Sequence, residues 1–211
     1  MDILRQADIV AMINSIAQAM KENRTHLIEL DSAIGDGDLG ITMDKGFAAA
    51  AKCAETNKAL APSAILMKAG MEIVKAAPST MGTLMGTGFM RGGKALAGKE
   101  SLVASDLIIF FKGFLQGVIE RGKAKLGDKT IIDVLVPAIA SMETYNGSDA
   151  SGLLDAAVIG AKEGLKAEKG MMSQHGKAAV FREKTRDLVD PGSEAMVILF
   201  QACRDSVSLA Q

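Results

Sequence analysis

Hydrophobic residues recur at three- and four-residue steps along most of the chain, which is the spacing of one face of an α-helix. The first such segment, residues 3–21, places Ile9, Ile13, Ile16 and Met20 on one face. No segment shows the polar–apolar alternation of a half-buried strand convincingly. The pattern therefore predicts about eight helices in an all-α fold. The seven further predicted helices cover residues 42–57, 61–77, 81–97, 103–121, 130–145, 149–168 and 192–208.

The composition agrees with closely packed helices. The chain has 211 residues, of which 48% are hydrophobic and only 4% aromatic, with no Trp. Ala, Leu, Met and Gly must therefore fill most of the core, which favours helices over sheets. There is no long linker rich in Pro, Ser or charge, so the simplest prediction is one all-α domain over residues 1–211.

The charge balance narrows the classes of partner. The chain carries 24 basic and 25 acidic residues, a net charge of −1, which does not indicate a generic nucleic-acid or anionic-membrane surface. No uncharged apolar stretch reaches the length of a membrane span, and the N-terminus lacks the features of a signal peptide. The two cysteines, Cys53 and Cys203, do not suggest a disulfide framework. We therefore expect a cytoplasmic protein that binds neither nucleic acid nor membranes.

Residues 31–40 concentrate three carboxylates and three glycines in ten positions. Two carboxylates about 5 Å apart repel each other by roughly 3 kcal/mol at an effective dielectric constant near 20, so a fold gathers them around a positive charge. Hard divalent cations take oxygen ligands and often carry a phosphate. Glycines let backbone amides approach an anion closely. The segment therefore predicts a metal–phosphate site formed by Asp31, Asp36 and Asp38.

Two other interpretations compete for this segment. An EF-hand does not fit, because the third and fifth loop positions would be Ala33 and Gly35 and the twelfth would be Thr42 in place of Glu. The remaining alternative is a solvated acidic loop in which Asp38 or Thr42 caps the following helix. Three carboxylates exceed what one helix cap needs, so the metal site is favoured.

Three further connections carry groups that suit a ligand. Residues 78–82 suit a helix start or a phosphate contact, and the helix start is favoured. Residues 121–133 hold basic residues that could neutralise a polyphosphate, as well as Thr130, which could cap a helix; a solvated loop is an equal alternative. The long segment 170–192, with Lys177 and other basic residues, favours a lid or binding loop over mere surface mobility. Residues 88–95 nearly match a P-loop, but no strand precedes them, so we interpret their glycines as helix-packing residues.

Taken together, three motifs resemble the L subunit of dihydroxyacetone kinase, the ADP-binding subunit of that kinase. They are Asp31 with residues 35–40, then Gly127-Asp-Lys-Thr-x-x-Asp133, and the Asp190-Pro-Gly192 turn. The resemblance covers nearly the whole chain. It implies an eight-helix antiparallel barrel in which nucleotide binds in the loops at one end.

The resemblance also implies the residues of the site. Asp31, Asp36 and Asp38 would hold two Mg²⁺ ions that bridge the phosphates of ADP or ATP. The chain departs from the family at Leu39, where His is common, at Thr42, where Asn is common, at Lys177, where Arg is usual, and in the loop at residues 79–82. The positions at which the family contacts the nucleotide are Leu39, Gly40, Ile41, Thr42, Thr80, Met81, Gly122, Ile131, Lys177, Asp190, Pro191 and Gly192.

The implied activity is phosphoryl transfer to dihydroxyacetone or a related short ketose or tetrose, with no protein nucleophile in this chain. A separate sugar-binding kinase subunit would supply the substrate site, and a homodimer is one expected assembly. The donor would be either ATP or bound ADP recharged by a phosphohistidine protein of the sugar phosphotransferase system. One alternative is a non-catalytic module that senses Mg-ADP and binds a regulator. Another is a helical domain whose acidic loop binds no nucleotide.

Overall fold

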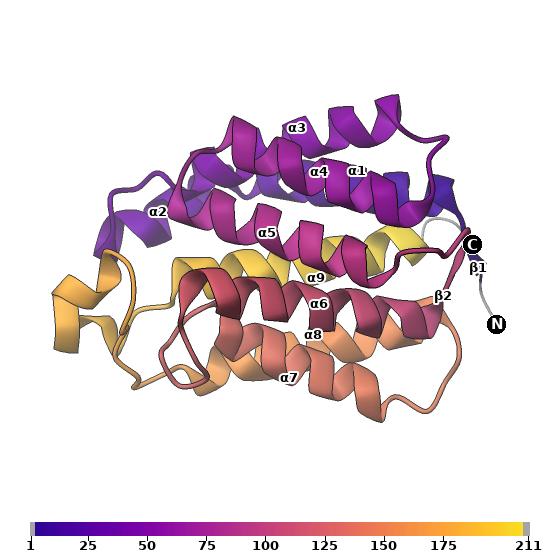
Figure 1. The fold of residues 1–211 in the computed structure, drawn as a ribbon. Coiled ribbons are helices and arrows are strands. Elements are labelled where there is room, and N and C mark those ends of the chain that lie inside the picture. The colour runs from indigo at the N-terminus through magenta and orange to yellow at the C-terminus, as the bar shows by residue number, and fades with distance from the viewer. Residues whose placement is uncertain (1–2, 209–211) are drawn as a thin grey trace.

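Nine α-helices make up most of the part of the chain that the computed structural model describes, residues 3–208 (Figure 1). A short 3₁₀ helix, η1 (Ala178–Thr185), lies between the last two of them. The α-helices are α1 (Gln6–Glu22), α2 (Arg24–Ile34), α3 (Leu39–Thr56), α4 (Pro62–Ala76), α5 (Thr80–Ala95), α6 (Ala104–Gly122), α7 (Ile131–Thr144), α8 (Ala150–Ala167) and α9 (Pro191–Ser208).

Eight of these helices form a closed ring. Going round it, α1 packs against α3, and each helix from α3 to α8 packs against the next, until α9 packs back against α1. Consecutive ring helices run in opposite directions (Figure 1). As a result α3, α5, α7 and α9 all begin at one end of the ring, where α2 and η1 also lie. The predicted eight-helix antiparallel barrel is confirmed.

The amphipathic helices are found where the sequence predicts them, within a few residues. The correction concerns α2, whose residues belong to none of the predicted helices. The helix α2 buries only Leu27 and Ile34 within its eleven residues. Two apolar positions are too few to produce a recognisable periodicity. Asp31 is therefore a helical residue, on the last turn of α2.

Phenylalanines concentrate in the interior of the ring. The Phe89 ring centroid lies 5.7 Å from that of Phe47, 5.6 Å from Phe110 and 5.8 Å from Phe114, all edge-on. Such pairs contribute about 0.5–1.5 kcal/mol beyond the burial of their area. A Cβ atom added at Gly88 would lie 2.6 Å from the Phe114 ring. The interpretation of this glycine as a helix-packing residue is confirmed.

At the end of the ring away from η1, two short strands join the chain's beginning to the α5–α6 connection. The strand β1 (Ile3–Leu4) pairs antiparallel with β2 (Leu102–Val103). Cys53 and Cys203 are both free thiols. None of the helices within residues 3–208 is both long enough and apolar enough to cross a bilayer.

Candidate functional site

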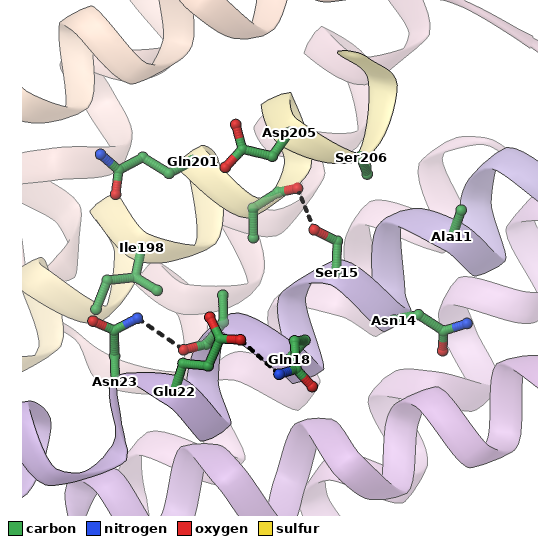
Figure 2. A pocket seen from close by; sticks show the side chains of 12 residues that line it. Ala11, Asn14, Ser15, Gln18, Glu22, Asn23, Ile198, Gln201, Asp205 and Ser206 are labelled. Carbon is green, nitrogen blue, oxygen red and sulfur yellow. Dashed lines mark hydrogen bonds between the residues drawn. The ribbon is translucent and has the colours of Figure 1, made fainter. Parts of the chain in front are cut away.

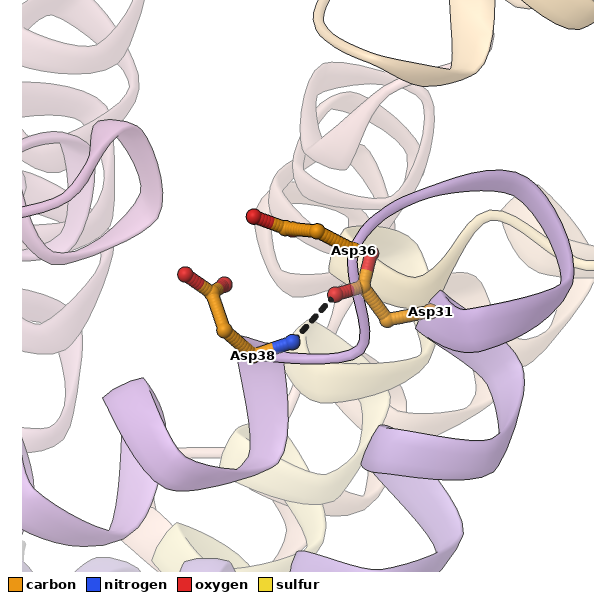
Figure 3. Close-up of side chains that lie close together, drawn as sticks. All are labelled: Asp31, Asp36 and Asp38. Atoms are coloured by element: carbon orange, nitrogen blue, oxygen red, sulfur yellow. Dashed lines mark hydrogen bonds between the residues drawn. The ribbon is translucent and has the colours of Figure 1, made fainter.

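The three aspartates of the acidic loop come together at the end of the ring where α3 begins. Asp31 lies on α2, Asp36 in the loop that follows, and Asp38 directly before α3. One carboxylate oxygen from each lies within 4.8 Å of the others, and Figure 3 shows the three side chains gathered around the loop. Asp36 and Asp38 are exposed and Asp31 is half-buried. Three hard oxygen donors at this separation fit a divalent cation.

Asp31 also holds the loop in shape. Its Oδ2 accepts a hydrogen bond from the backbone N–H of Asp38, at 2.9 Å (Figure 3), and another from that of Leu39, at 3.2 Å. The fold needs glycine at Gly35, where a Cβ would lie 2.2 Å from Asp31 Oδ1, and at Gly37, whose φ is +72°. The loop therefore folds back over Asp31.

Neither Asp38 nor Thr42 caps α3 with its side chain, as the less favoured alternative for this segment would have it. Asp38 occupies the N-cap position, but its side chain makes no capping hydrogen bond. Thr42 is buried within α3, and its backbone N–H donates to the Asp38 carbonyl oxygen at 2.9 Å. Asp31 takes over part of the capping from the preceding helix. The Asp36 and Asp38 carboxylates are thus not committed to ending a helix.

A cleft of about 230 Å³ opens beside the three aspartates. Its wall combines the carboxylates with apolar side chains and with residues of the 170–192 connection. The lining residues are Asp31, Ile34, Asp36, Asp38, Leu39, Ser79, Thr80, Met81, Leu84, Thr130, Ile131, His175, Gly176, Lys177, Ala178, Asp190, Pro191 and Gly192.

Four helices begin at the wall of this cleft. They are α3, α5, α7 and α9, whose first residues are Leu39, Thr80, Ile131 and Pro191. The first N–H groups of a helix have no partner within it, and each helix start carries about half a positive charge. Four such starts beside a cation site favour an anion that also binds the cation, such as a phosphate.

Side-chain caps accept hydrogen bonds from only some of the N–H groups at these helix starts. Ser79 Oγ accepts from the Gly82 N–H at 3.1 Å, and Thr130 Oγ1 accepts from the Ile132 N–H at 3.3 Å. The prediction that Thr130 caps a helix is confirmed. Asp190 Oδ2 accepts from the N–H of Ser193 at 2.9 Å.

Residues 170–189, which we call the cover segment, lie across the end of the ring at this cleft. Lys177 forms an ion pair with Asp36 across the opening. His175 Nε2 lies 2.9 Å from Asp128 Oδ2. Burial acts to raise the pKa of the Asp128 carboxyl, but hydrogen bonds from the Lys125 N–H and the His175 ring outweigh it and hold that pKa below its ordinary value. The cover segment thus contacts both the acidic loop and the turn before α7.

A buried acid, Glu168, and a half-buried one, Asp190, lie where α8 ends and α9 begins. Burial raises the pKa of Glu168 to about 9 and that of Asp190 to about 6. The Ser193 hydroxyl donates to Glu168 Oε1, while Glu168 Oε2 has no partner. Glu168 therefore carries a proton at neutral pH, and the wall beside Asp190 has one negative charge fewer than the sequence suggests.

The structure brings most of the expected site residues to the cleft, but not all. Gly40 and Ile41 lie in the first turn of α3, whose backbone N–H groups have no partner within the helix. Thr42 is buried, and Gly122 ends α6 behind Leu84. These four do not line the cleft. Those that do are Asp31, Asp36, Asp38, Leu39, Thr80, Met81, Ile131, Lys177, Asp190, Pro191 and Gly192.

Some residues that line the cleft are not among those predicted for the site. Ser79 and Thr130 were recognisable as helix starts, which was a usable signal. Ile34 and Leu84 are apolar helix residues whose sequence context resembles that of any core position. None of the basic residues of 121–133 lines the cleft, and Lys129 is buried, so their place in the structure does not support contact with a polyphosphate there.

A larger hollow, about 680 Å³, lies between α1 and α9 (Figure 2). Its polar groups already bond to one another: Ser15 donates to the Ala202 carbonyl at 2.8 Å and Gln18 to Glu22 at 2.6 Å. The group of side chains within residues 3–208 that could hold a metal ion is the aspartate cluster, which lies at the other cleft. The smaller cleft is therefore the better candidate site.

Comparison with known proteins agrees with this architecture. The family model of the DAK2 domain matches residues 33–205, which span most of the ring and the cleft, so the chain belongs to the DAK2 domain family. Among its relatives is the PEP-dependent dihydroxyacetone kinase, ADP-binding subunit DhaL, of Escherichia coli. That protein is 30% identical over 203 residues, which cover 94% of this chain and 95% of the relative.

A second relative gives the same assignment, and a solved structure has the same fold. The ADP-binding subunit DhaL of PEP-dependent dihydroxyacetone kinase 1 from Listeria innocua is 32% identical over 190 residues, covering 90% of this chain and 91% of the relative. The structure of the dihydroxyacetone kinase from C. freundii in complex with AMP-PNP and Mg²⁺ matches with a TM-score of 0.68 and 22% identity. It covers 95% of this chain and 34% of that one. The resemblance to the L subunit is confirmed.

Proposed function

We propose that this chain is the Mg²⁺-dependent, nucleotide-binding subunit of a kinase for dihydroxyacetone or a related short ketose or tetrose. The observation that carries the proposal is the cluster of Asp31, Asp36 and Asp38 beside four helix starts in one cleft. The names of the relatives, ADP-binding subunits of dihydroxyacetone kinase, support it. A separate sugar-binding subunit would bring the acceptor hydroxyl to this end of the ring.

Each wall of the cleft has a role in this proposal. The three aspartates would hold two Mg²⁺ ions, which supply charge neutralisation at the phosphate oxygens when bound. The first-turn amides of α3, α5, α7 and α9 that the side-chain caps leave without an acceptor would orient those oxygens, because the first N–H groups of a helix have no partner within it. Catalysis by this chain would then consist of positioning and electrostatic stabilisation, with no protein nucleophile.

The rest of the lining would fix the nucleotide in place. Ile34, Met81 and Leu84 offer an apolar surface for a base, and Leu39 extends it. Lys177 would exchange its contact with Asp36 for a phosphate oxygen, as a point charge in place of a two-pronged Arg contact. The relatives' description as PEP-dependent supports a donor scheme in which ADP stays bound and is recharged by a phosphohistidine protein.

The nucleotide content of the freshly purified protein tests the donor. The protein would be denatured before and after chelation, and the released nucleotide identified by chromatography. Stoichiometric ADP that is lost on chelation is the expected result. An empty protein that binds ATP only with added Mg²⁺ would replace this scheme by an exchangeable ATP donor. An empty protein that binds neither nucleotide would overturn the proposed function.

A double variant tests the metal site. Asp36→Asn combined with Asp38→Asn removes two of the three anionic ligands and leaves the loop-shaping Asp31 in place. We expect Mg-ADP affinity to fall at least about 100-fold, since loss of charged contacts costs several kcal/mol. The helical circular dichroism should not change. Asp155→Asn, an exposed aspartate on α8, is the matched control and should bind as the wild type does. Unchanged binding by the double variant would contradict the assignment.

A further inference from the structure

The cover segment holds its position over the cleft with little apolar packing. Its 3₁₀ helix η1 buries only Thr185. Val180 has 80% of its surface exposed and Phe181 38%. Hydrophobic burial of the kind that holds the ring helices together is therefore weak here. Some other interaction must place Lys177 and His175 at the opening.

Lys129 supplies that interaction from inside the molecule. Only 1% of its surface is exposed, although a buried lysine is costly unless its donors are satisfied. Its Nζ donates to the carbonyl oxygens of Thr185 at 2.5 Å, Met171 at 3.2 Å and Arg186 at 3.5 Å. An ammonium group has three N–H donors, so three carbonyl oxygens satisfy it. All three belong to the cover segment, one near its beginning and two near its end.

The residues on either side of Lys129 add further ties. The carbonyl oxygen of Asp128 accepts from the Gln174 N–H at 3.0 Å, and its carboxylate meets His175. On the other side, Thr130 caps α7 and lines the cleft. Lys129 itself has a left-handed backbone, with φ of 58°, which is uncommon for a residue with a side chain. The turn 128–130 thus connects the cover segment to the cleft wall.

We propose that Lys129 is a positioning residue: through the turn 128–130 it fixes the cover segment where Lys177 and His175 close the cleft. Lys129 does not line the cleft, so it acts on a ligand only through these residues. As far as it concerns nucleotide, the inference rests on the proposed function. We expect Lys129 to slow the release of bound nucleotide and not to form the metal site, because the aspartate cluster is built by other elements.

Trypsin tests the mechanical part without any ligand. The cover segment offers cleavage sites at Lys177, Arg182, Lys184 and Arg186, whose side chains are exposed. A protease needs the backbone around such a site to unfold locally, so the cleavage rate reports how readily the segment opens. In Lys129→Met the side chain keeps its length and loses its donors. We expect cleavage within the segment to accelerate at least about tenfold, since hydrogen bonds to a charged group carry that factor or more. The control is Lys162→Met, an exposed lysine on α8.

A second variant keeps the test decisive if Lys129→Met does not fold. His175→Ala breaks the tie to Asp128 at a side chain that is 38% exposed, so the ring should tolerate it. We expect faster cleavage after Lys177, by a smaller factor than in Lys129→Met. Cleavage at the wild-type rate in the folded variants would overturn the inference.

The release rate of bound ADP in saturating Mg²⁺ tests the functional part. We expect Lys129→Met to release ADP at least about tenfold faster than the wild type or Lys162→Met, because the same hydrogen bonds to the cover segment are lost. Faster proteolysis with an unchanged release rate would overturn the positioning role and leave a structural tie. If the wild type binds no nucleotide, the proposed function fails, whereas the proteolysis result still decides whether Lys129 holds the segment.

Discussion

At the scale of single residues, Asp31 differs from the other two aspartates of the cluster. It accepts two backbone hydrogen bonds that shape the loop. Asp36, in contrast, forms an ion pair with the exposed side chain of Lys177. Charge-assisted hydrogen bonds to backbone N–H groups stabilise a fold more than exposed ion pairs do. The three side chains are therefore not equivalent before any metal binds.

This difference predicts unequal effects on stability. In the presence of a chelator, Asp31→Ala should lower the free energy of unfolding by about 1–2 kcal/mol, since it leaves two amides without an acceptor. Asp36→Ala should change it by less than about 0.5 kcal/mol and could raise it slightly, because it relieves repulsion among the carboxylates. Urea denaturation measures both values. Equal losses in the two variants would show that Asp31 has no separate structural role.

Glu168 predicts a dependence of stability on pH. Its pKa is about 9 in the folded protein, against an ordinary value of 4.5, so between these values the folded state binds a proton that the unfolded chain has lost. The contribution of Glu168 to the free energy of unfolding is therefore fully present below about pH 4.5 and is lost as the pH rises towards 9. The slope is at most about 1.4 kcal/mol per pH unit. Asp190 adds the same sign only up to its own pKa of about 6.

The variant Glu168→Gln isolates this effect. It keeps the shape and an oxygen that accepts from the Ser193 hydroxyl, and it cannot ionise. Between pH 6.5 and 8.5, the unfolding free energy of the wild type should fall by on the order of 1 kcal/mol per pH unit. The profile of Glu168→Gln should be flatter by that amount. Parallel profiles in urea unfolding would argue against a protonated Glu168.

The candidate site shows how far single residues can be predicted from sequence. The aspartate cluster was predictable, because three carboxylates in eight positions have few other uses. The burial of Lys129 was not, because in sequence it is one of several basic residues in a polar loop. Only the carbonyl oxygens of the cover segment, more than forty residues away, make that burial favourable.

At the scale of elements, close packing by glycine sets the distance between helices. Gly88 and Gly92 on α5 face Phe114 and Phe110 on α6, and a Cβ at either position would lie 2.6 Å from a ring. Gly88→Ala should therefore lower the unfolding free energy by about 1–3 kcal/mol through overpacking, despite the better helix propensity of Ala. Thr87→Ala, at the half-buried neighbouring position, should change it by less than about 0.5 kcal/mol. A neutral Gly88→Ala would mean that α6 moves away at little cost.

Elements were predictable in proportion to what they bury. The ring helices each bury a continuous apolar face, as α6 does with Leu107, Phe111, Phe114 and Val118. That face produces the periodicity that reveals them. The helix α2 and the segment η1 bury very little, so they produce no such pattern. Their conformations depend on tertiary contacts with the cleft, which a local pattern does not contain.

At the scale of the whole molecule, the site joins four helices that are far apart in sequence. A ligand that binds their starts together stabilises the ring as a unit, since it binds the folded state and not the unfolded chain. At about 100 times its dissociation constant, Mg-ADP should add about 2.7 kcal/mol, which corresponds to a rise in melting temperature of about 5–10 °C for a chain of this size.

Thermal unfolding with and without chelator measures this effect. ADP with excess chelator should give no rise in melting temperature, and Mg²⁺ alone should give a smaller one. The double variant Asp36→Asn with Asp38→Asn should lose the rise while melting near the wild-type temperature without ligand. A rise that persists in chelator would show that ADP binds independently of the aspartate cluster.

The placement of the first and last described elements has a consequence for gene fusion. The strand β1 and the last turn of α9 lie together at the end of the ring opposite the cleft and the cover segment (Figure 1). A second domain could be tethered at either end without obstructing the cleft or pulling on Lys129. The same ring can therefore correspond to 95% of the length of a separate E. coli subunit and to 34% of the C. freundii kinase chain. The ring is therefore compatible with both arrangements, a chain of its own and a part of a longer polypeptide.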